Sequence, residues 1–444
     1  MSRSAGNALG IYVSIPFCRS KCTYCNFASG VYPASEHARY VERVIADLRG
    51  ARTWAQNVGA ELPQRVDTVY LGGGTPSLLA PDLVTRLFAA LHAEFDLDAN
   101  AEITMECAPG QLAAATLEAM AASGVNRVSL GVQSFVDSEA HASGRLHSRA
   151  VVEEDLRRLR AAGITNLNVD LIAGLAGQTL DSWNESLDAL LASEVPHASI
   201  YMLEVDEDSR LGREMLKGGA RYHAGLVPGE DAIVKMYEEA IERLKAAGLP
   251  QYEISNFARP GQESRHNLRY WQRRPYLGVG LDASSMLRDS AAACMFIGQE
   301  SGAKREGRDL LPFSQEKRKG WGTAGSELCA AGSVLRATTT ENLTMYLAGA
   351  GATEMEWLAP ERQCEEAWFL GLRTNAGVDV SELRTEFGSC LVEQSIRTAK
   401  RLAEDGMLIL DGERVRLTVR GRLISNEVFQ EFLVPENAET GRAM

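Results

Sequence analysis

The most informative absences in this 444-residue sequence concern membrane segments, secretion and disulfides. No apolar run approaches the ~20 residues that a membrane-spanning helix requires. The chain opens on polar residues and a short strand-like segment, not on a secretory signal. Its eight cysteines show no disulfide-type spacing. We therefore expect a protein of the reducing cytoplasm, with at most a peripheral membrane association.

Positive charge is also scarce. Lys and Arg number 46 against 59 Asp and Glu, which gives a formal net charge of −13 at pH 7. The nearest approach to a basic cluster, Lys317-Arg318-Lys319, is short. Because nucleic-acid binding depends on neutralising phosphates, we do not expect nucleic acid as the main partner. The chain is long enough for two or three domains with substantial cores.

Three cysteines stand close together, in a C-x3-C-x2-C arrangement of Cys18, Cys22 and Cys25. Closed zinc sites and ordinary all-cysteine iron–sulfur clusters use four protein ligands. Three thiolates on a [4Fe-4S] cluster would leave one iron open to another ligand. A zinc site would instead need a distant histidine to complete it. The spacing favours the cluster and leaves the zinc site as the alternative.

The first half of the chain alternates strand-like and helix-like patterns, which predicts an α/β fold with parallel strands. Short apolar segments are expected as strands: Ile11–Ile15, Val66–Leu71, Glu102–Glu106, Arg127–Val132, Asn166–Leu171 and Ala198–Leu203. Amphipathic segments are expected as helices: Ser35–Arg49, Pro81–Glu94, Gln111–Ser123, Arg149–Ala162 and Thr179–Ala192. About six such units form a β/α barrel, complete or partial.

Unusual residues follow these strands at their carboxyl ends, where β/α barrels collect their active sites. The cysteine loop follows the first strand. Gly72-Gly73-Gly74-Thr75-Pro76 follows the second, and its lack of side chains lets the backbone approach a ligand. Later strands end at or near Glu106, Gln133, Asp170 and Glu204. An unpaired buried carboxylate is costly, so Asp170 requires a partner such as Arg145, or a ligand.

The rest of the chain is less regular, apart from its last part. A helix is expected over Asp231–Ala247. Helices over Pro360–Leu372, Val380–Phe387 and Val392–Asp405, a hairpin of Met407–Leu410 with Arg414–Leu417, and a helix over Ile424–Phe432 predict a winged-helix-like domain. The expected parts are a partial barrel (1–255), a flanking segment (256–354), the C-terminal domain (355–436) and a flexible tail (437–444).

The cysteine spacing, with an aromatic residue before Cys25 and Phe27 after it, resembles the radical S-adenosylmethionine (SAM) superfamily. This resemblance implies an open, three-quarter barrel and a [4Fe-4S] cluster on the three cysteines. It also implies SAM bound at the open iron and cleaved to a radical by an electron from a reductant such as flavodoxin or ferredoxin. The implied cofactor-binding residues are Tyr12, Tyr24, Gly73, Gly74, Thr75, Glu106, Gln133, Arg145 and Asp170.

Further strings resemble the coproporphyrinogen-oxidase-like branch of that superfamily, and within it the heme chaperone HemW family. They are Tyr12–Cys18, Gly72–Pro76, Gly131–Phe135, Asp170–Thr179 and, most specifically, the H-N-x-x-Y-W string of residues 266–271. The resemblance implies heme as a ligand and a heme acceptor protein as a partner. His266 is then a candidate axial ligand of heme iron. Ser284 stands where that family usually has a histidine.

Three functions share the barrel and the cluster: a heme chaperone, an oxygen-independent coproporphyrinogen III oxidase and a radical SAM methyltransferase. The oxidase is expected to carry a fourth cysteine two residues after the third, and a longer N-terminal arm. Here Phe27 occupies that position, and 17 residues precede Cys18. The H-N-x-x-Y-W string favours the chaperone over the methyltransferase. We therefore expect a heme chaperone, with the oxidase as the alternative.

Overall fold

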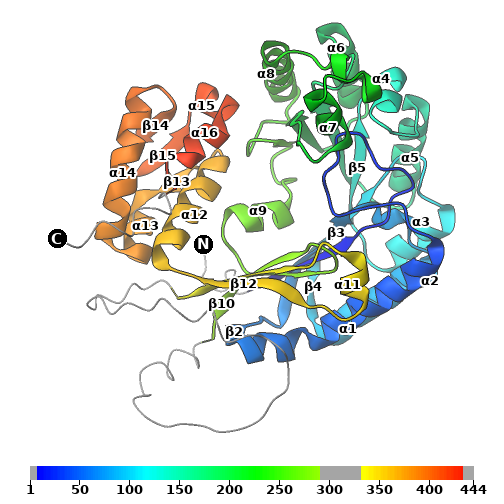
Figure 1. Cartoon of the computed structure of the whole chain (residues 1–444), viewed down its shortest axis with the longest axis horizontal. Coiled ribbons are helices and arrows are strands. Elements are labelled where there is room, and N and C mark those ends of the chain that lie inside the picture. The colour runs from blue at the N-terminus through cyan, green and yellow to red at the C-terminus, as the bar shows by residue number, and fades with distance from the viewer. Residues whose placement is uncertain (1–7, 291–331, 434–444) are drawn as a thin grey trace.

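A single large sheet organises the computed structural model, which describes residues 8–290 and 332–433. Its strands run in the order β12-β11-β10-β9-β1-β3-β4-β5-β6-β7-β8, and β2 pairs with β10. The bounds are β1 Leu9–Ile15, β2 Ala60–Glu61, β3 Arg65–Gly73, β4 Asp96–Cys107, β5 Arg127–Gln133, β6 Asn166–Ala173, β7 His197–Met202, β8 Asn256–Ala258, β9 Tyr276–Val279, β10 Ser284–Asp289, β11 Val334–Thr339 and β12 Ala352–Leu358. The sheet is curved and does not close into a barrel, because its two edge strands, β8 and β12, do not pair with each other (Figure 1).

The six predicted strands correspond to β1, β3, β4, β5, β6 and β7, and neighbours among them pair in parallel. The prediction of a partial α/β barrel is therefore confirmed. β9 adds one more parallel strand on the other side of β1. β10–β12 and β8 extend the sheet in antiparallel fashion. The sheet thus continues past residue 255, where the sequence suggested a boundary.

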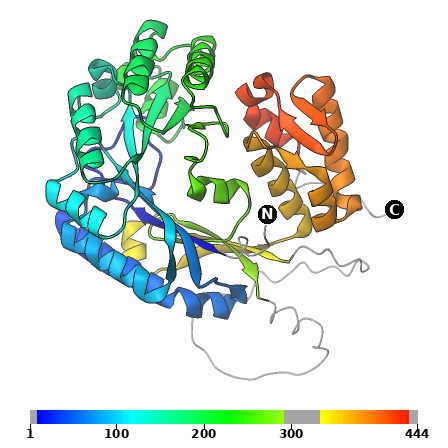
Figure 2. The same ribbon diagram turned by 180° about the vertical axis from the view of Figure 1, so that it is seen from behind.

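Helices cover the outer face of the curved sheet (Figure 1 and Figure 2). The principal ones are α1 Ala34–Val58, α2 Pro81–Glu94, α3 Ala114–Ala122, α5 Arg149–Ala161, α6 Leu180–Ala192 and α8 Glu230–Ala246. α1 continues beyond its predicted end at Arg49. Glycine weakens a helix by about 1 kcal/mol relative to alanine, but the helix runs through Gly50 because Ala51 and Ala55 are buried behind it. Among the described helices, none is both long and apolar enough to cross a membrane.

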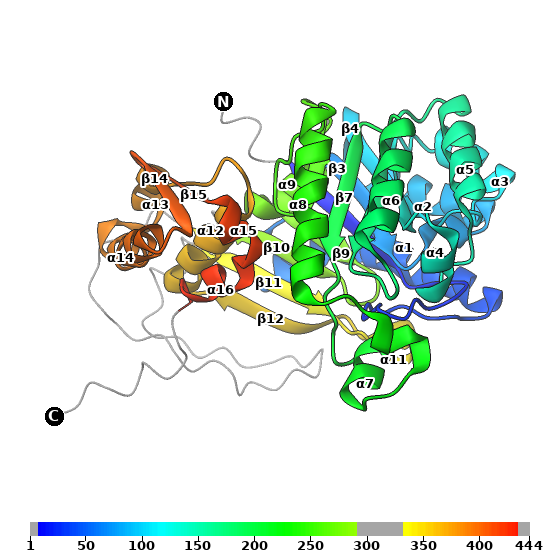
Figure 3. The same cartoon turned by 90° about the horizontal axis from the view of Figure 1, so that it is seen from above.

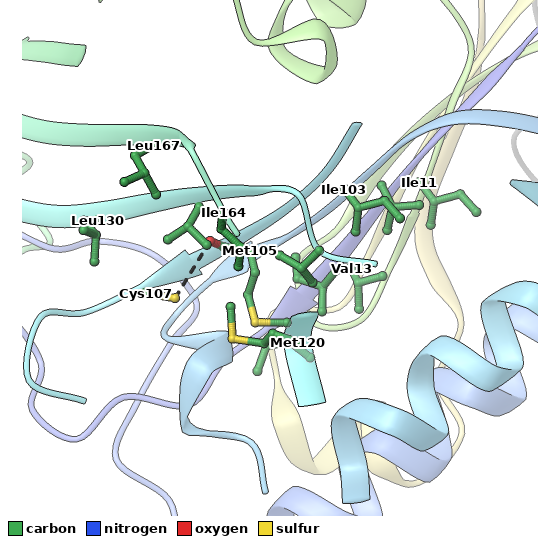
Figure 4. Close-up of a cluster of buried hydrophobic side chains, with 14 of the residues drawn as sticks. Ile11, Val13, Ile103, Met105, Cys107, Met120, Leu130, Ile164 and Leu167 are labelled. Atoms are coloured by element: carbon green, nitrogen blue, oxygen red, sulfur yellow. Dashed lines mark hydrogen bonds between the residues drawn. The ribbon is translucent and has the colours of Figure 1, made fainter. Parts of the chain in front are cut away.

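The main core lies between these helices and the sheet (Figure 4). Side chains alternate between the two faces of a strand. Along β4, Ile103 and Met105 join the apolar layer together with Ile11 and Val13 of β1, whereas Glu106 points to the other side and lines a cavity. The inner face of the sheet is therefore left for polar side chains.

The C-terminal domain has its own core, in which Trp368 stacks on Phe432. It contains α12 Pro360–Arg373, α13 Val380–Phe387, α14 Ser389–Glu404, α15 Val419–Leu423 and α16 Ser425–Gln430, with a small sheet of β13 Val378–Asp379, β15 Arg414–Leu417 and β14 Leu408–Asp411. The separate, winged-helix-like domain predicted from the sequence is confirmed. It sits beside the barrel in two perpendicular views (Figure 1 and Figure 3). The predicted tail, 437–444, lies outside the described residues.

Candidate functional site

A cavity of about 1100 Å³ opens along the inner face of the sheet. Its walls extend from the cysteine loop to the end of α15 and the start of α16 in the C-terminal domain. Every site residue predicted from the sequence lines this cavity except Tyr12 and His266. The lining residues among them are Cys18, Cys22, Tyr24, Cys25, Gly73, Gly74, Thr75, Glu106, Gln133, Arg145 and Asp170, and Glu204 lines it as well. Residues far apart in the sequence therefore share one site.

The cysteine loop between β1 and α1 is held by its own backbone. Cys18 N–H donates to Gly30 O (2.8 Å), and Gly30 N–H donates to Pro16 O (2.9 Å). Lys21 Nζ donates to the carbonyl oxygens of Phe27 (3.0 Å) and Ser29 (3.1 Å). The loop is thereby closed on itself, with its three free thiols facing a single cavity.

The loop supplies three thiols to this part of the cavity, one fewer than a closed tetrahedral zinc site uses. In a [4Fe-4S] cluster each thiolate binds a different iron, so three thiolates leave one iron open. Cys107 also reaches the cavity wall, but burial raises the pKa of its thiol to about 12. In the absence of a metal, Cys107 is therefore held as the neutral thiol.

The glycine turn after β3 packs directly on the cysteine loop. Gly74 N–H donates to Ile15 O and Thr75 N–H to Phe17 O, both at 2.8 Å. A Cβ atom at Gly74 would lie 2.8 Å from each of these carbonyl oxygens. The absence of a side chain at Gly74 therefore lets two protein segments meet. This reason differs from the predicted approach of the backbone to a ligand, although the turn also lines the cavity.

Glu106 lies beside this turn, at the end of β4. Its carboxylate accepts hydrogen bonds from the Tyr70 hydroxyl (2.8 Å) and from Gly73 N–H (3.1 Å). Burial raises the pKa of Glu106 to about 7. The hydrogen bond from the Tyr70 hydroxyl acts to lower this pKa, and the charge of Asp170 acts to raise it. When ionised, this carboxylate can accept a hydrogen bond from a ligand ammonium group.

Gln133 and Arg145 flank the same cavity from β5 and the segment after α4 (Asp137–Ala142). Gln133 has φ +73° at the point where the pairing of β5 with β6 shifts register. A non-glycine residue in this conformation is uncommon and often marks a functional position. Arg145 donates to the Tyr24 hydroxyl (3.1 Å), and its buried Nε has no hydrogen-bond partner.

Asp170 forms no ion pair with Arg145, which the sequence offered as one candidate partner beside a ligand. Its carboxylate instead accepts hydrogen bonds from Ser129 Oγ (3.0 Å) and Asn168 Nδ2 (2.7 Å). Neutral donors thus satisfy Asp170, and burial raises its pKa. The sequence required a partner for this residue but could not show which one.

Several cavity residues were missed because the strands were interpreted as uniformly buried. The missed residues are Arg127 and Ser129 on β5, Asn168 on β6, and Ser199 and Tyr201 on β7, which share alternate positions with the predicted Gln133 and Asp170. This period of two is the signal of a polar inner face. It was present in the sequence.

His266 lies in α9 (Arg265–Trp271), fully buried and away from the cavity lining. Its Nδ1 is 3.0 Å from Thr68 Oγ1, and its Nε2 is 2.9 Å from the Tyr270 hydroxyl. Burial lowers its pKa to about 3, so the ring is neutral. Both nitrogens are occupied, so His266 cannot ligate heme iron in this conformation. Tyr12, which also does not line the cavity, packs against His266 with ring centroids 6.5 Å apart.

The rest of the H-N-x-x-Y-W string joins parts of the protein. The Tyr270 ring packs edge-on against Tyr276 of β9 at 4.6 Å, and the Arg373 guanidinium of α12 lies 4.3 Å from the Trp271 ring centroid. Asn267 is the residue of this string that lines the cavity. Ser284, at the position of the missing histidine, is exposed and lies 3.1 Å from Thr338 Oγ1.

Comparison with known proteins identifies the family. The radical SAM superfamily matches residues 12–190, and the HemN C-terminal domain matches residues 358–424. The heme chaperone HemW of Lactococcus lactis subsp. lactis is 30% identical over 425 residues, which cover 96% of this chain and 97% of that protein. This chain belongs to the HemW family of radical SAM proteins. The HemW of Bacillus subtilis is also 30% identical, covering 95% of this chain and 98% of its own.

Two further relatives are consistent with this membership. Radical S-adenosyl methionine domain-containing protein 1, mitochondrial, of Mus musculus is 30% identical, covering 97% of this chain and 88% of that protein. The solved structure of coproporphyrinogen III oxidase (HemN) from Escherichia coli superposes with a TM-score of 0.74 at 20% identity, covering 96% of this chain and 90% of the other. It shares the fold. Radical SAM membership implies a [4Fe-4S] cluster and SAM, as the resemblance predicted.

Proposed function

We propose that this protein is a heme chaperone, which binds a [4Fe-4S] cluster, SAM and heme and transfers heme to an acceptor protein. The observation that carries the proposal is the similarity to heme chaperones over nearly the full length of both chains. The cavity between the barrel and the C-terminal domain offers a site for the ligands. A reductant such as flavodoxin or ferredoxin is the second proposed partner.

The chain's own residues would divide the binding of the cofactors. Cys18, Cys22 and Cys25 would hold the cluster, which supplies the electron for cleavage of SAM when both are bound. The glycine turn at Gly73 and the carboxylate of Glu106 would hold the amino-acid end of SAM. Gln133, Arg145 and Asp170 would hold the rest, with Tyr24 orienting Arg145 through its hydroxyl. The surrounding walls would exclude water.

Coproporphyrinogen III oxidase is the second candidate, because that enzyme shares this fold over 96% of the chain. The residue that would be its fourth cysteine is Phe27, whose side chain is exposed. We therefore expect no carbon dioxide release when the reconstituted protein is incubated anaerobically with SAM, reductant and coproporphyrinogen III. Sustained decarboxylation would replace the chaperone proposal with the oxidase.

Heme binding and transfer test the proposal directly. Titration of the purified protein with hemin is expected to give a saturable change in the Soret band. Mixing the loaded protein with an apo-heme protein is expected to move the spectrum to that of the acceptor faster than free hemin does. Absence of a saturable change in the Soret band would refute heme binding.

The cluster has its own test. Anaerobic reconstitution should give iron and sulfide in the ratio of a [4Fe-4S] cluster, and replacing Cys18, Cys22 and Cys25 together by Ala should abolish it. Cys390 is a matched control, since it is an exposed free thiol in the first turn of α14. Cys390→Ala should retain full iron content. Equal iron content in the triple variant would contradict the assignment.

A further inference from the structure

Arg127 occupies the first position of β5 and lines the cavity. Its side chain is 1% exposed. In the described part of the chain, the Arg127 guanidinium makes no ion pair, and its buried Nε has no hydrogen-bond partner. The mechanism proposed above does not use this residue.

Three other buried or partly buried arginines each have a side-chain partner. Arg269 pairs with Asp67, Arg145 donates to Tyr24, and Arg373 lies 3.6 Å from Glu253, although the Nε atoms of Arg145 and Arg373 also lack a hydrogen-bond partner. The carboxylate of Asp170, on the neighbouring strand, accepts hydrogen bonds from Ser129 and Asn168 rather than from Arg127. A buried, unpaired charge is costly to a folded protein. The charge of Arg127 acts to lower the pKa of Asp170 without a hydrogen bond between the two side chains, so the guanidinium donors face the cavity available to an anionic ligand.

The carboxylate of SAM is too far away to be this ligand. SAM would bind at the open iron, near the carboxyl ends of β1, β3 and β5. Arg127 and Gln133 are the first and last residues of β5. At roughly 3.3 Å per residue they stand about 20 Å apart along the strand. The anion at Arg127 therefore belongs to a second molecule that occupies the same cavity.

Small and polar side chains surround Arg127 on the inner face of the sheet. Its neighbours on the inner face, Ser129, Asn168 and Ser199, are small or polar and line the cavity. A guanidinium binds a carboxylate through two parallel hydrogen bonds. We propose that Arg127 binds a propionate side chain of the tetrapyrrole, an inference that rests on the proposed binding of heme.

Esterification of the ligand tests this assignment. Hemin and hemin dimethyl ester share the macrocycle and the iron, but the ester has no carboxylate. The cluster-reconstituted wild type should bind hemin about tenfold or more tightly than the ester, since a hydrogen-bonded charge contributes at least that much. Arg127→Gln should bind the two ligands with similar affinities, and its affinity for SAM should equal that of the wild type.

Arg157→Gln serves as the control, because Arg157 is an exposed arginine outside the cavity lining and already has Glu154 as a partner. It should preserve the preference for hemin over the ester. The melting temperature of ligand-free Arg127→Gln should equal or exceed that of the wild type, because an unpaired buried charge has been removed.

Each other outcome of these binding measurements contradicts a specific part of the proposal. Hemin binding without any preference over the ester in the wild type overturns the role of Arg127 and leaves the chaperone proposal intact. Loss of SAM affinity in Arg127→Gln assigns the residue to SAM instead. An equal loss of preference in both arginine variants overturns the specific assignment. Absence of hemin binding in the wild type overturns this inference together with the proposed function.

Discussion

Glu106 and Asp170 are carboxylates of one cavity, and each is satisfied by neutral donors. Tyr70 and Gly73 donate to Glu106, while Ser129 and Asn168 donate to Asp170. Burial raises both pKa values, and that of Glu106 reaches about 7. The ligand-free fold therefore favours the protonated form of Glu106. A ligand ammonium group that binds to this carboxylate would stabilise its ionised form.

The pH dependence of stability follows from the raised pKa of Glu106. The folded state favours the neutral carboxyl, so its contribution is present below about pH 4.5 and is lost as the pH rises through about 7. Glu106→Gln avoids this loss. We expect the variant to gain up to about 3 kcal/mol relative to the wild type between pH 5 and pH 8. Thermal denaturation across this range measures it, and a constant difference would contradict the expectation.

His266 is a structural residue in this geometry, since Thr68 and Tyr270 occupy both ring nitrogens. We expect His266→Ala to leave the Soret spectrum of bound hemin unchanged and to destabilise the fold by about 2 kcal/mol, because two buried hydroxyl groups lose a partner. Absorption and denaturant titration separate these effects. His223→Ala, at an exposed position, should change neither quantity. A shifted Soret band in His266→Ala would restore the ligand role.

At this scale the sequence was informative wherever a residue type is unusual for its position. The cysteines, Glu106 and Asp170 could be predicted because thiols in a short loop and acids in apolar strands require an explanation. Arg127 was overlooked because an arginine at the start of a strand is ordinary, and only the folded cavity shows that it lacks a partner. The orientation of a side chain such as His266 is set by its packing in the folded protein, which the sequence alone does not show.

Two loops at the ends of β1 and β3 act as one element. Gly74 and Thr75 donate to the carbonyl oxygens of Ile15 and Phe17, so backbone hydrogen bonds hold the glycine turn against the start of the cysteine loop. The sequence predicted both loops at strand ends but treated them as separate binding motifs. Their mutual packing depends on strand pairing in the folded sheet.

Gly74→Ala tests this coupling. The added Cβ would meet two backbone carbonyls at 2.8 Å, and overpacking of this kind costs about 1–3 kcal/mol. We expect a lower melting temperature and reduced iron after reconstitution. Gly50→Ala is the control, because no atom lies within 4 Å of the added Cβ and the position is inside α1. It should gain about 0.5–1 kcal/mol. Normal iron content in Gly74→Ala would refute the coupling.

At the scale of the whole molecule, the C-terminal domain is anchored to the barrel by charged and aromatic contacts. Arg373 lies over Trp271 and near Glu253, and Arg273 Nη2 lies 2.5 Å from Glu386 Oε2. The cavity continues into this domain, so its position helps to shape the site. The two domains could be predicted from their patterns, but their contact could not.

Loss of the Trp271 ring should loosen this anchoring. A partly buried cation–π contact contributes about 1–2 kcal/mol, so Trp271→Ala is expected to speed amide hydrogen exchange and proteolysis in residues 360–433 while the cluster remains intact. Trp357→Ala, an exposed tryptophan on β12, should leave exchange unchanged. Unaltered exchange in Trp271→Ala would show that the remaining contacts suffice.

β9 is one of the strands that the sequence did not reveal, since Tyr276–Val279 is too short to show a periodicity. It lies against β1, on the side opposite β3, so the strand that leads into the cysteine loop is completed by a segment synthesised long afterwards. A nascent chain on the ribosome therefore carries its three thiols on an unfinished sheet edge. Iron–sulfur delivery is expected to follow translation, when the late strand has docked and the loop has a fixed support.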